Sequence, residues 1–365
     1  MNSNRFLKNF ICFASAFLLL AAGIVILFDP FYHYHAPLPG LKAVLTDKEY
    51  QCIGSLRNFE YDSVLAGSSV AENFNNGWFD EAFQVTLIKA IRASGTTADL
   101  NYYLQEAYQS RKKRETRIRR VFYNLDTAAL FADPATTFEA TGQPMYLYNR
   151  NPFDDVLYLW NADVLFEKLP LMLADSFLKD YDEGESYNWA KWKTFGVDMV
   201  RKAYTPSEEV LASRGEDADS ELLTANLEML TKLVREHPET EFVFYFPPYS
   251  LVWWDEAYRT GELERDLKGK EAAAEQLLAF PNVRVYDFQE DETVILDPEN
   301  YMDTLHFSRE ITYQMFRTFS GERTADTLGE PYEVTIERIG ENSERMRELV
   351  QRIEETELWK YYEKP

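Results

Sequence analysis

Residues 61–74 read YDSVLAGSSVAENF and decide the fold that we predict for this chain. The apolar run 64–66 ends in Gly67-Ser68-Ser69, and the residues after it have apolar positions at helical spacing. This pattern predicts a strand, a tight turn and the start of a helix. Ligand sites in open parallel sheets lie at the carboxyl ends of strands, where a turn hydroxyl also faces the positive end of the next helix. Ser69 is therefore a candidate nucleophile, although a serine in such a turn can instead simply cap the helix.

A second stretch, residues 300–308, supplies partners for that serine and reads NYMDTLHFS. A serine hydroxyl needs a base that takes its proton, and the base needs a third group that fixes its tautomer. The chain has four histidines. Three are readily discounted, since two flank the apolar N-terminal segment and one precedes a proline. The sequence thus predicts Ser69 as nucleophile, His306 as base and Asp303 as the acid that orients it.

With these two motifs the chain resembles the SGNH (GDSL-type) hydrolases over residues 60–320. The match is Gly67-Ser68-Ser69 together with Asp303-Thr304-Leu305-His306. An apolar N-terminus and the segment Phe246-Pro247-Pro248-Tyr249-Ser250 are similar to a membrane-anchored branch. That branch includes the D-alanyl transfer protein of lipoteichoic acid biosynthesis and the accessory proteins of alginate and cellulose O-acetylation. The resemblance implies a three-layer, flavodoxin-like α/β domain that uses serine chemistry, with no cofactor.

The resemblance also implies a set of oxyanion donors. They are the backbone amides of Ser69 and Gly95, together with an asparagine side chain. Gly95 has an alternative reading as a turn glycine with positive φ. The family has Gly-x-Asn-Asp where this chain has Asn124-Leu125-Asp126. Either Asn124 is a displaced donor, or Asp126 holds the loop and the side-chain donor is missing.

Other residues around these motifs are expected to contact substrate, and they are Ser68, Asp126, Tyr249 and Trp253. Removal of one oxyanion donor typically lowers kcat by ~10²–10³. The departure from the family pattern therefore puts rapid hydrolysis in doubt.

Alternating apolar runs and helical patterns predict five strands, near residues 61–67, 83–89, 117–126, 241–246 and 283–288. Helices are predicted at 98–111, 220–236 and 263–278. This order indicates a parallel five-stranded sheet with helices on both faces. The domain is expected to span residues 61–325, with a helical, aromatic-rich insertion at 128–218 and a charged C-terminal helix at 326–365. The aromatic residues of the insertion either form its own core or offer a platform for sugar rings.

The N-terminal segment, residues 1–30, predicts a membrane anchor. Arg5 and Lys8 precede an uncharged stretch at 9–28, close to the ~20 residues that a spanning helix requires. The alternative is a cleaved signal peptide, whose apolar region is usually ~7–15 residues. Positive charge on the N-terminal side favours a cytoplasmic N-terminus and an extracytoplasmic domain, joined by a connecting region at 31–60. The nearby pair His33 and His35 is too weak a pattern to predict a metal site.

Charge and cysteine content exclude some classes of function. The chain has 38 Lys and Arg residues against 61 Asp and Glu residues, a net charge of −23 that repels nucleic acid. Of its two cysteines, Cys12 falls in the predicted anchor, so no internal disulfide is expected. We therefore expect a cell-envelope protein without a nucleic-acid partner or a metal.

These patterns lead to two hypotheses for function. The first is an extracytoplasmic, membrane-tethered serine acyl hydrolase or acyltransferase. It would act on ester-linked acyl groups of a cell-envelope polymer or polysaccharide, with a membrane-bound acyltransferase as partner. The second is a noncatalytic assembly or polymer-binding protein of the same fold, favoured by the departure from Gly-x-Asn-Asp.

Overall fold

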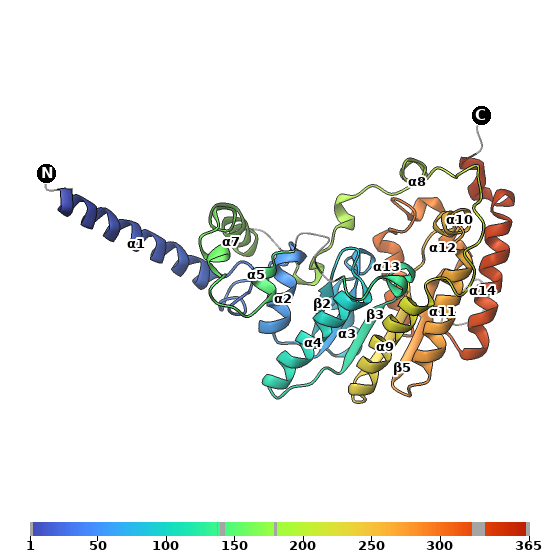
Figure 1. Ribbon diagram of the computed structural model, residues 1–365, viewed down its shortest axis with the longest axis horizontal. Coiled ribbons are helices and arrows are strands. Elements are labelled where there is room, and N and C mark those ends of the chain that lie inside the picture. The colour runs from blue at the N-terminus through green and yellow to red at the C-terminus, as the bar shows by residue number, and fades with distance from the viewer. Residues whose placement is uncertain (1–2, 137, 139–142, 179–180, 323–332, 363–365) are drawn as a thin grey trace.

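The structure is a computed structural model that describes residues 3–136, 138, 143–178, 181–322 and 333–362. A long helix, α1 (Ser3–Phe28), projects from an α/β domain that holds most of the remaining chain (Figure 1). Its segment Asn4–Phe28 contains an 18-residue stretch with a mean hydropathy of 2.8 and is long and apolar enough to cross a membrane. The predicted domain boundary at residues 325/326 lies outside the described residues.

A parallel sheet forms the centre of the domain, with strand order β2-β1-β3-β4-β5. The strands are β1 (Ser63–Gly67), β2 (Leu87–Ile91), β3 (Arg120–Asn124), β4 (Glu241–Phe246) and β5 (Val283–Asp287). Almost every strand residue is buried, as expected when helices cover both faces of a parallel sheet. The predicted α/β fold with a five-stranded parallel sheet is confirmed.

Side chains of successive strand residues enter two separate cores. In β1, Val64 and Ala66 belong to one core and Leu65 to the other. The first core includes α2 (Lys48–Asn58), α4 (Thr97–Lys113) and α9 (Ser220–Glu236), and the second includes α3 (Asn76–Phe83), α10 (Leu251–Arg259), α13 (Arg309–Phe319) and α14 (Ile336–Gln351). Helix α11 (Leu263–Leu278) contributes to both, and α14 also adds Ile339 to the first core. The sheet therefore lies between two layers of helices.

The second strand was predicted too early in the chain. Phe83 is the last residue of α3, and its ring packs against Phe79 and Phe122. Gln84, in the left-handed conformation, ends that helix, and β2 begins only at Leu87. An apolar run that joins a helix end to a strand start has no period of its own, so the pattern could not separate them.

The helix predicted directly after Ser69 was also wrong. Ser69–Ala71 forms a single 3-10 turn, η1, and α3 begins only at Asn76, where the Asn75 side chain accepts the Gly77 N–H at 2.8 Å. A helix macrodipole needs several aligned peptide groups. Its stabilising effect on Ser69 is therefore smaller than expected.

The connecting region 31–60 and the insertion 128–218 both contain helices that the sequence pattern did not predict individually. Residues 31–60 contain α2, whose buried side chains pack on β2 and α4. The insertion consists of short elements: α5 (Met145–Tyr148), α6 (Val156–Leu159), the π-helix η4 (Val164–Lys168), α7 (Leu169–Phe177) and α8 (Val197–Ala203). In Figure 1 the first part of the insertion lies beside the end of α1, away from the sheet. The insertion therefore reaches from α1 to the strand ends.

Candidate functional site

Ser69 lies directly beyond the carboxyl end of β1, in the turn that the sequence indicated. The turn is tight because Gly67 has no side chain. A Cβ at this position would lie 2.5 Å from the Ala71 Cβ and 2.9 Å from the Asn124 Cβ. Ser69 is partly exposed, whereas Ser68 is buried. The backbone therefore leaves the Ser69 side chain partly exposed at the carboxyl ends of the strands.

His306 and Asp303 reach Ser69 from the loop after β5. Ser69 Oγ and His306 Nε2 are 2.7 Å apart, and His306 Nδ1 and Asp303 Oδ2 are also 2.7 Å apart. The backbone N–H groups of Leu305 and His306 donate to Asp303 Oδ1 at 2.9 and 2.7 Å. The structure thus places these three side chains in one hydrogen-bonded chain, although 237 residues separate Ser69 from His306.

The loop that carries His306 is fixed to the end of β4. Ser250 N–H and Oγ both donate to the Thr304 carbonyl, at 3.2 and 2.5 Å. Tyr301 OH donates to the Pro248 carbonyl at 2.6 Å. The Pro-rich segment after β4 therefore holds the histidine loop in position.

The electrostatics of Asp303 suit a partner of an imidazole. Burial acts to raise the pKa of Asp303, but the His306 side chain and the two backbone amides outweigh it and hold that pKa below its usual value of 3.8. Asp303 is therefore ionised at neutral pH. Its carboxylate accepts a hydrogen bond from His306 Nδ1–H. This leaves Nε2 as the acceptor that faces Ser69.

Asp126, which lines the same cavity as Ser69 and His306, has the reverse pKa shift. Burial raises the pKa of Asp126, while hydrogen bonds from Ser68, Tyr249 and Asn124 partly offset the effect. Its Oδ1 accepts from Tyr249 OH and, at 3.3 Å, from Asn124 Nδ2. Asp126 thus ties the loop after β3 to the loop after β4, one of the two alternatives that the sequence left open.

The donors expected for an oxyanion are mostly occupied. The Asn124 amide nitrogen faces Asp126, and its Oδ1 accepts from both Ser68 N–H and Ser68 Oγ at 3.2 Å. The Gly95 N–H donates to the Arg92 carbonyl at 3.0 Å. Ser69 begins η1, so its N–H has no acceptor inside that turn. Of the three expected donors, Gly95 is engaged and Asn124 uses one of its two N–H groups, so the Ser69 amide is the least committed among the described residues.

A glycine is needed at position 95 because a side chain would not fit there, and not because the position has a positive φ. The residue with positive φ in this turn is Ser94, at 52°. A Cβ on Gly95 would lie 3.0 Å from both the Cβ and the carbonyl oxygen of Arg92. The prediction that Gly95 supplies a positive φ in this turn is therefore wrong, because Ser94 has that conformation. The close contact with Arg92 also explains why the Gly95 amide points inward.

A cavity of about 260 Å³ opens over Ser69 and His306. The four residues predicted to contact substrate all line it, since Ser68, Asp126, Tyr249 and Trp253 form part of its wall. The remaining lining residues are Ser94, Gly95, Thr96, Ala128, Ala129, Ala132 and Leu305. Asn124 is not among the lining residues, consistent with its turn toward Asp126. The cavity is large enough for an acyl group on a short alcohol or sugar.

Trp189 was not singled out from the sequence as a site residue. Its indole Nε1 donates to the Ser69 carbonyl at 2.9 Å, and its ring meets the His306 ring edge to face at 5.3 Å. The backbone N–H of Trp189 in turn donates to Asn73 Oδ1 at 3.2 Å. An insertion tryptophan 120 residues from the serine has no spacing signal that could have identified it. It packs directly against the Ser69–His306 pair.

The structure contains no group of three or more His, Cys, Asp or Glu side chains that could hold a metal ion within the described residues. The two histidines that follow α1, His33 and His35, have partners in the protein. His33 Nε2 lies 3.2 Å from Asp155, and the His35 ring nitrogens lie 2.6 and 2.8 Å from the carbonyls of Ala36 and Ile26. Both rings serve the structure of the chain around α1.

Comparison with known proteins yields little. No known protein family matches the chain, and no curated protein matches it. One solved structure from Streptococcus pneumoniae, provisionally described as a platelet activating factor, shares 14% identity at a TM-score of 0.38. The match covers 74% of this chain and 87% of that one. At this TM-score the likeness adds nothing to the evidence from the site itself.

Proposed function

We propose that this protein is a membrane-tethered serine acyl hydrolase or acyltransferase of the SGNH type. One observation carries the proposal: Ser69 Oγ, His306 Nε2, His306 Nδ1 and Asp303 Oδ2 form a continuous chain of two 2.7 Å contacts. A side-chain nucleophile, a base within hydrogen-bond reach and a carboxylate that orients the base are the requirements for covalent acyl transfer. They lie beside a cavity large enough for an acyl ester.

In the proposed reaction, Ser69 Oγ attacks the carbonyl carbon of an ester while His306 Nε2 takes the hydroxyl proton. His306 then gives this proton to the leaving alcohol, and Ser69 becomes acylated. A second alcohol or water attacks the acyl-enzyme, with His306 again as base. Asp303 holds His306 in the tautomer with a proton on Nδ1 and stabilises the imidazolium that forms. The Ser69 N–H is the donor available to the developing oxyanion.

Transfer to a hydroxyl is the favoured outcome. Because the Gly95 and Asn124 donors are engaged elsewhere, unassisted hydrolysis of small esters should be slow. The insertion contributes Trp189 and residues of the segment 128–132 to the surroundings of Ser69, where an acceptor that occupies the open cavity would displace water. We propose that the acceptor is a carbohydrate or polyol of the cell envelope. A membrane-bound acyltransferase is the proposed source of the acyl group.

A noncatalytic role is the second candidate. The same occupied donors favour it, because a site that cannot polarise a carbonyl would bind a polymer without reaction. The two candidates differ in whether Ser69 ever becomes acylated.

A fluorophosphonate probe distinguishes these two candidates. Wild-type protein should be labelled, and the Ser69→Ala and His306→Ala variants should not. Ser94→Ala is the matched control, since Ser94 lines the same cavity. Labelling that persists in Ser69→Ala would exclude Ser69 as nucleophile.

A p-nitrophenyl acetate series with and without oligosaccharides then separates transfer from hydrolysis. We expect a burst of p-nitrophenol followed by slow turnover that acceptors accelerate. Fast turnover that ignores every acceptor would indicate a plain esterase. Absence of any burst would favour the noncatalytic role.

A further inference from the structure

The first part of the insertion packs against the outer half of α1. We define residues 153–178, which contain α6, η4 and α7, as the collar. Trp160 Nε1 donates to the Leu18 carbonyl of α1 at 2.8 Å, and both α6 and η4 contact α1. On α1 itself, Ala21, Ala22 and Val25 are buried. The helix and the collar thus form one packed unit.

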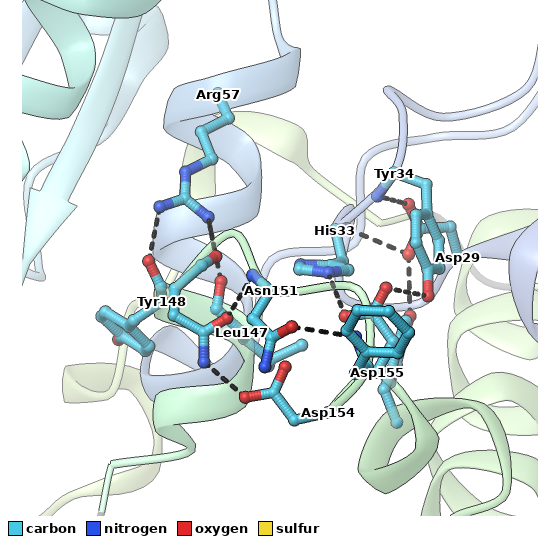
Figure 2. Close-up of polar contacts among 12 residues, drawn as sticks. Asp29, His33, Tyr34, Arg57, Leu147, Tyr148, Asn151, Asp154 and Asp155 are labelled. Atoms are coloured by element: carbon cyan, nitrogen blue, oxygen red, sulfur yellow. Dashed lines mark hydrogen bonds and ion pairs between the residues drawn. The ribbon is translucent and has the colours of Figure 1, made fainter.

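A polar joint fixes the collar to the end of α1 (Figure 2). Asp29 is fully buried and accepts the backbone N–H groups of residues 33–35 at 3.0, 2.7 and 2.9 Å. It also accepts from Tyr158 OH at 2.8 Å. Asp155 accepts from Tyr34 OH at 3.0 Å and contacts His33. Loss of α1 would remove the packing partner of this joint, so the contacts favour an anchor that stays attached.

The collar exposes an unusual amount of apolar surface. Among the described residues, eight of the fifteen exposed large hydrophobic side chains outside α1 belong to it. They are Phe153, Val156, Leu157, Trp160, Phe166, Leu171, Phe177 and Leu178, with Phe153, Phe166 and Leu178 respectively 85%, 78% and 84% exposed. Large contiguous apolar patches on a protein mark an interaction surface. These eight side chains belong to one segment that contacts α1, and we call them the patch.

The length of α1 indicates what covers the patch. The part of α1 before its hydrogen bond to the collar at Leu18, Phe6–Phe17, spans about 18 Å at ~1.5 Å per residue. The hydrocarbon core of a bilayer is about 30 Å thick. An amphipathic helix in the interface buries its apolar face by about 5–10 Å, which makes up most of the difference. Ile26 and Leu27 of α1 are also exposed, so apolar surface continues beside the collar.

We propose that the collar is a second membrane-contacting element, whose exposed apolar side chains insert among the acyl chains of the outer leaflet. Asp163 and Glu167 are exposed on the same segment and remain in the headgroup layer. Because these charges are negative and the whole chain carries −23, anionic lipids do not attract the collar. Its insertion depends on apolar burial and is insensitive to salt. The inference rests on the proposed anchor and topology and does not depend on catalysis.

Spin labels test the position of the collar in the full-length protein, reconstituted in phosphatidylcholine vesicles. Single cysteines replace Phe166, Leu178, Phe13 or Tyr313 in a Cys12→Ser background, with Cys52 left in place because it is buried. Phe13 reports on α1 and Tyr313 on the α/β domain, and both side chains are exposed. Collision rates with oxygen and with a nickel chelate then distinguish lipid from water at each label.

The collar labels should resemble Phe13, with nickel-chelate collision rates about tenfold below that of Tyr313 because the polar chelate is excluded from hydrocarbon. Water-like collision rates at Phe166 and Leu178 with lipid-like rates at Phe13 would overturn the collar proposal and leave the anchor intact. Water-like rates at Phe13 as well would overturn both. Shielding that requires an added membrane protein would assign the patch to a protein partner and overturn lipid insertion. None of these outcomes depends on acyl chemistry, so they are separable from the probe-labelling result.

Discussion

The two sides of Ser69 differ in how much of an acyl-transfer site they contain. On one side, His306 and Asp303 form two 2.7 Å contacts that end at the serine oxygen. On the other side, the Asn124 amide faces Asp126 and the Gly95 amide faces the Arg92 carbonyl. The means to activate a nucleophile are in place, whereas the means to stabilise the resulting oxyanion are largely committed elsewhere.

This difference suggests that the two functions are separable in this protein. Proton transfer relies on side chains from one loop that Asp303 organises internally. The other candidate oxyanion donors, Gly95 after β2 and Asn124 at the end of β3, come from different segments and bind Arg92 and Asp126 instead.

Removal of His306 should have the largest effect. In His306→Ala we expect the rate of Ser69 acylation to fall by about 10⁴–10⁶, because nucleophile and base act as one unit. Asp303→Asn should cost about 10⁴, since the amide favours the wrong tautomer of the imidazole. His237→Ala, which changes a histidine stacked on Tyr108, is the control and should keep the wild-type rate. Equal rates in His306→Ala and His237→Ala would remove the base from the mechanism.

Gly67 lies at the junction of the two sides, and Gly67→Ala should disturb both. The added methyl group would lie 2.5 Å from the Ala71 Cβ and 2.9 Å from the Asn124 Cβ. We expect the free energy of unfolding to fall by about 1–3 kcal/mol, a typical cost of overpacking. Gly340→Ala in α14, where no atom lies within 4 Å, is the control and should be neutral or stabilising. Equal unfolding midpoints for the two variants in urea would contradict the close packing.

Asn124→Ala tests directly whether the asparagine belongs to the oxyanion side. As an oxyanion donor, Asn124 would contribute a factor of ~10²–10³ to kcat. The structure instead assigns its amide to Ser68 and Asp126. We therefore expect kcat to fall by less than about tenfold and the free energy of unfolding to fall by about 1–3 kcal/mol, since the buried Ser68 N–H loses its acceptor. A large loss of kcat with unchanged stability would restore Asn124 as a donor.

The sequence predicted the elements with strong local signals. The limits of β4, α9 and α11 match their predicted ranges, because an apolar run stopped by Pro247 or a long helical period leaves little freedom. The start of β2 and the length of the helix after Ser69 were wrong. There, the outcome depends on the packing of Phe83 and on the Asn75 cap rather than on any period.

The candidate site divides in the same way. Ser69, Asp303 and His306 could be proposed from residue type and order, since their chemistry requires those residues in those loops. The orientation of Gly95 and Asn124 depends on contacts with Arg92 and Ser68, and the place of Trp189 depends on how the insertion folds back. Such tertiary contacts leave no trace in spacing. The collar was missed because its apolar residues resemble those of an ordinary core.

The smallest expected effect is a pH dependence that separates the two carboxylates beside Ser69. The pKa of Asp303 lies below 3.8, so its contribution to stability is present above that pH and is lost as the pH falls further. The pKa of Asp126 lies above 3.8 because of burial. Its contribution has the opposite sign and is lost as the pH rises through that raised value. On acidification, Asp126 therefore takes up its proton first and stabilises the folded protein, and Asp303 follows and destabilises it.

Carboxyl carbon chemical shifts and urea unfolding between pH 3 and 7 measure this order. Asp126→Asn should abolish the gain in unfolding free energy on mild acidification, whereas Asp303→Asn should abolish the loss at the acid end. Titration of Asp126 below Asp303 would reverse the assignment. It would mean that solvent reaches the oxyanion side as freely as the base side. The proposed contrast between a desolvated Asp126 and a hydrogen-bonded, ionised Asp303 would then be wrong.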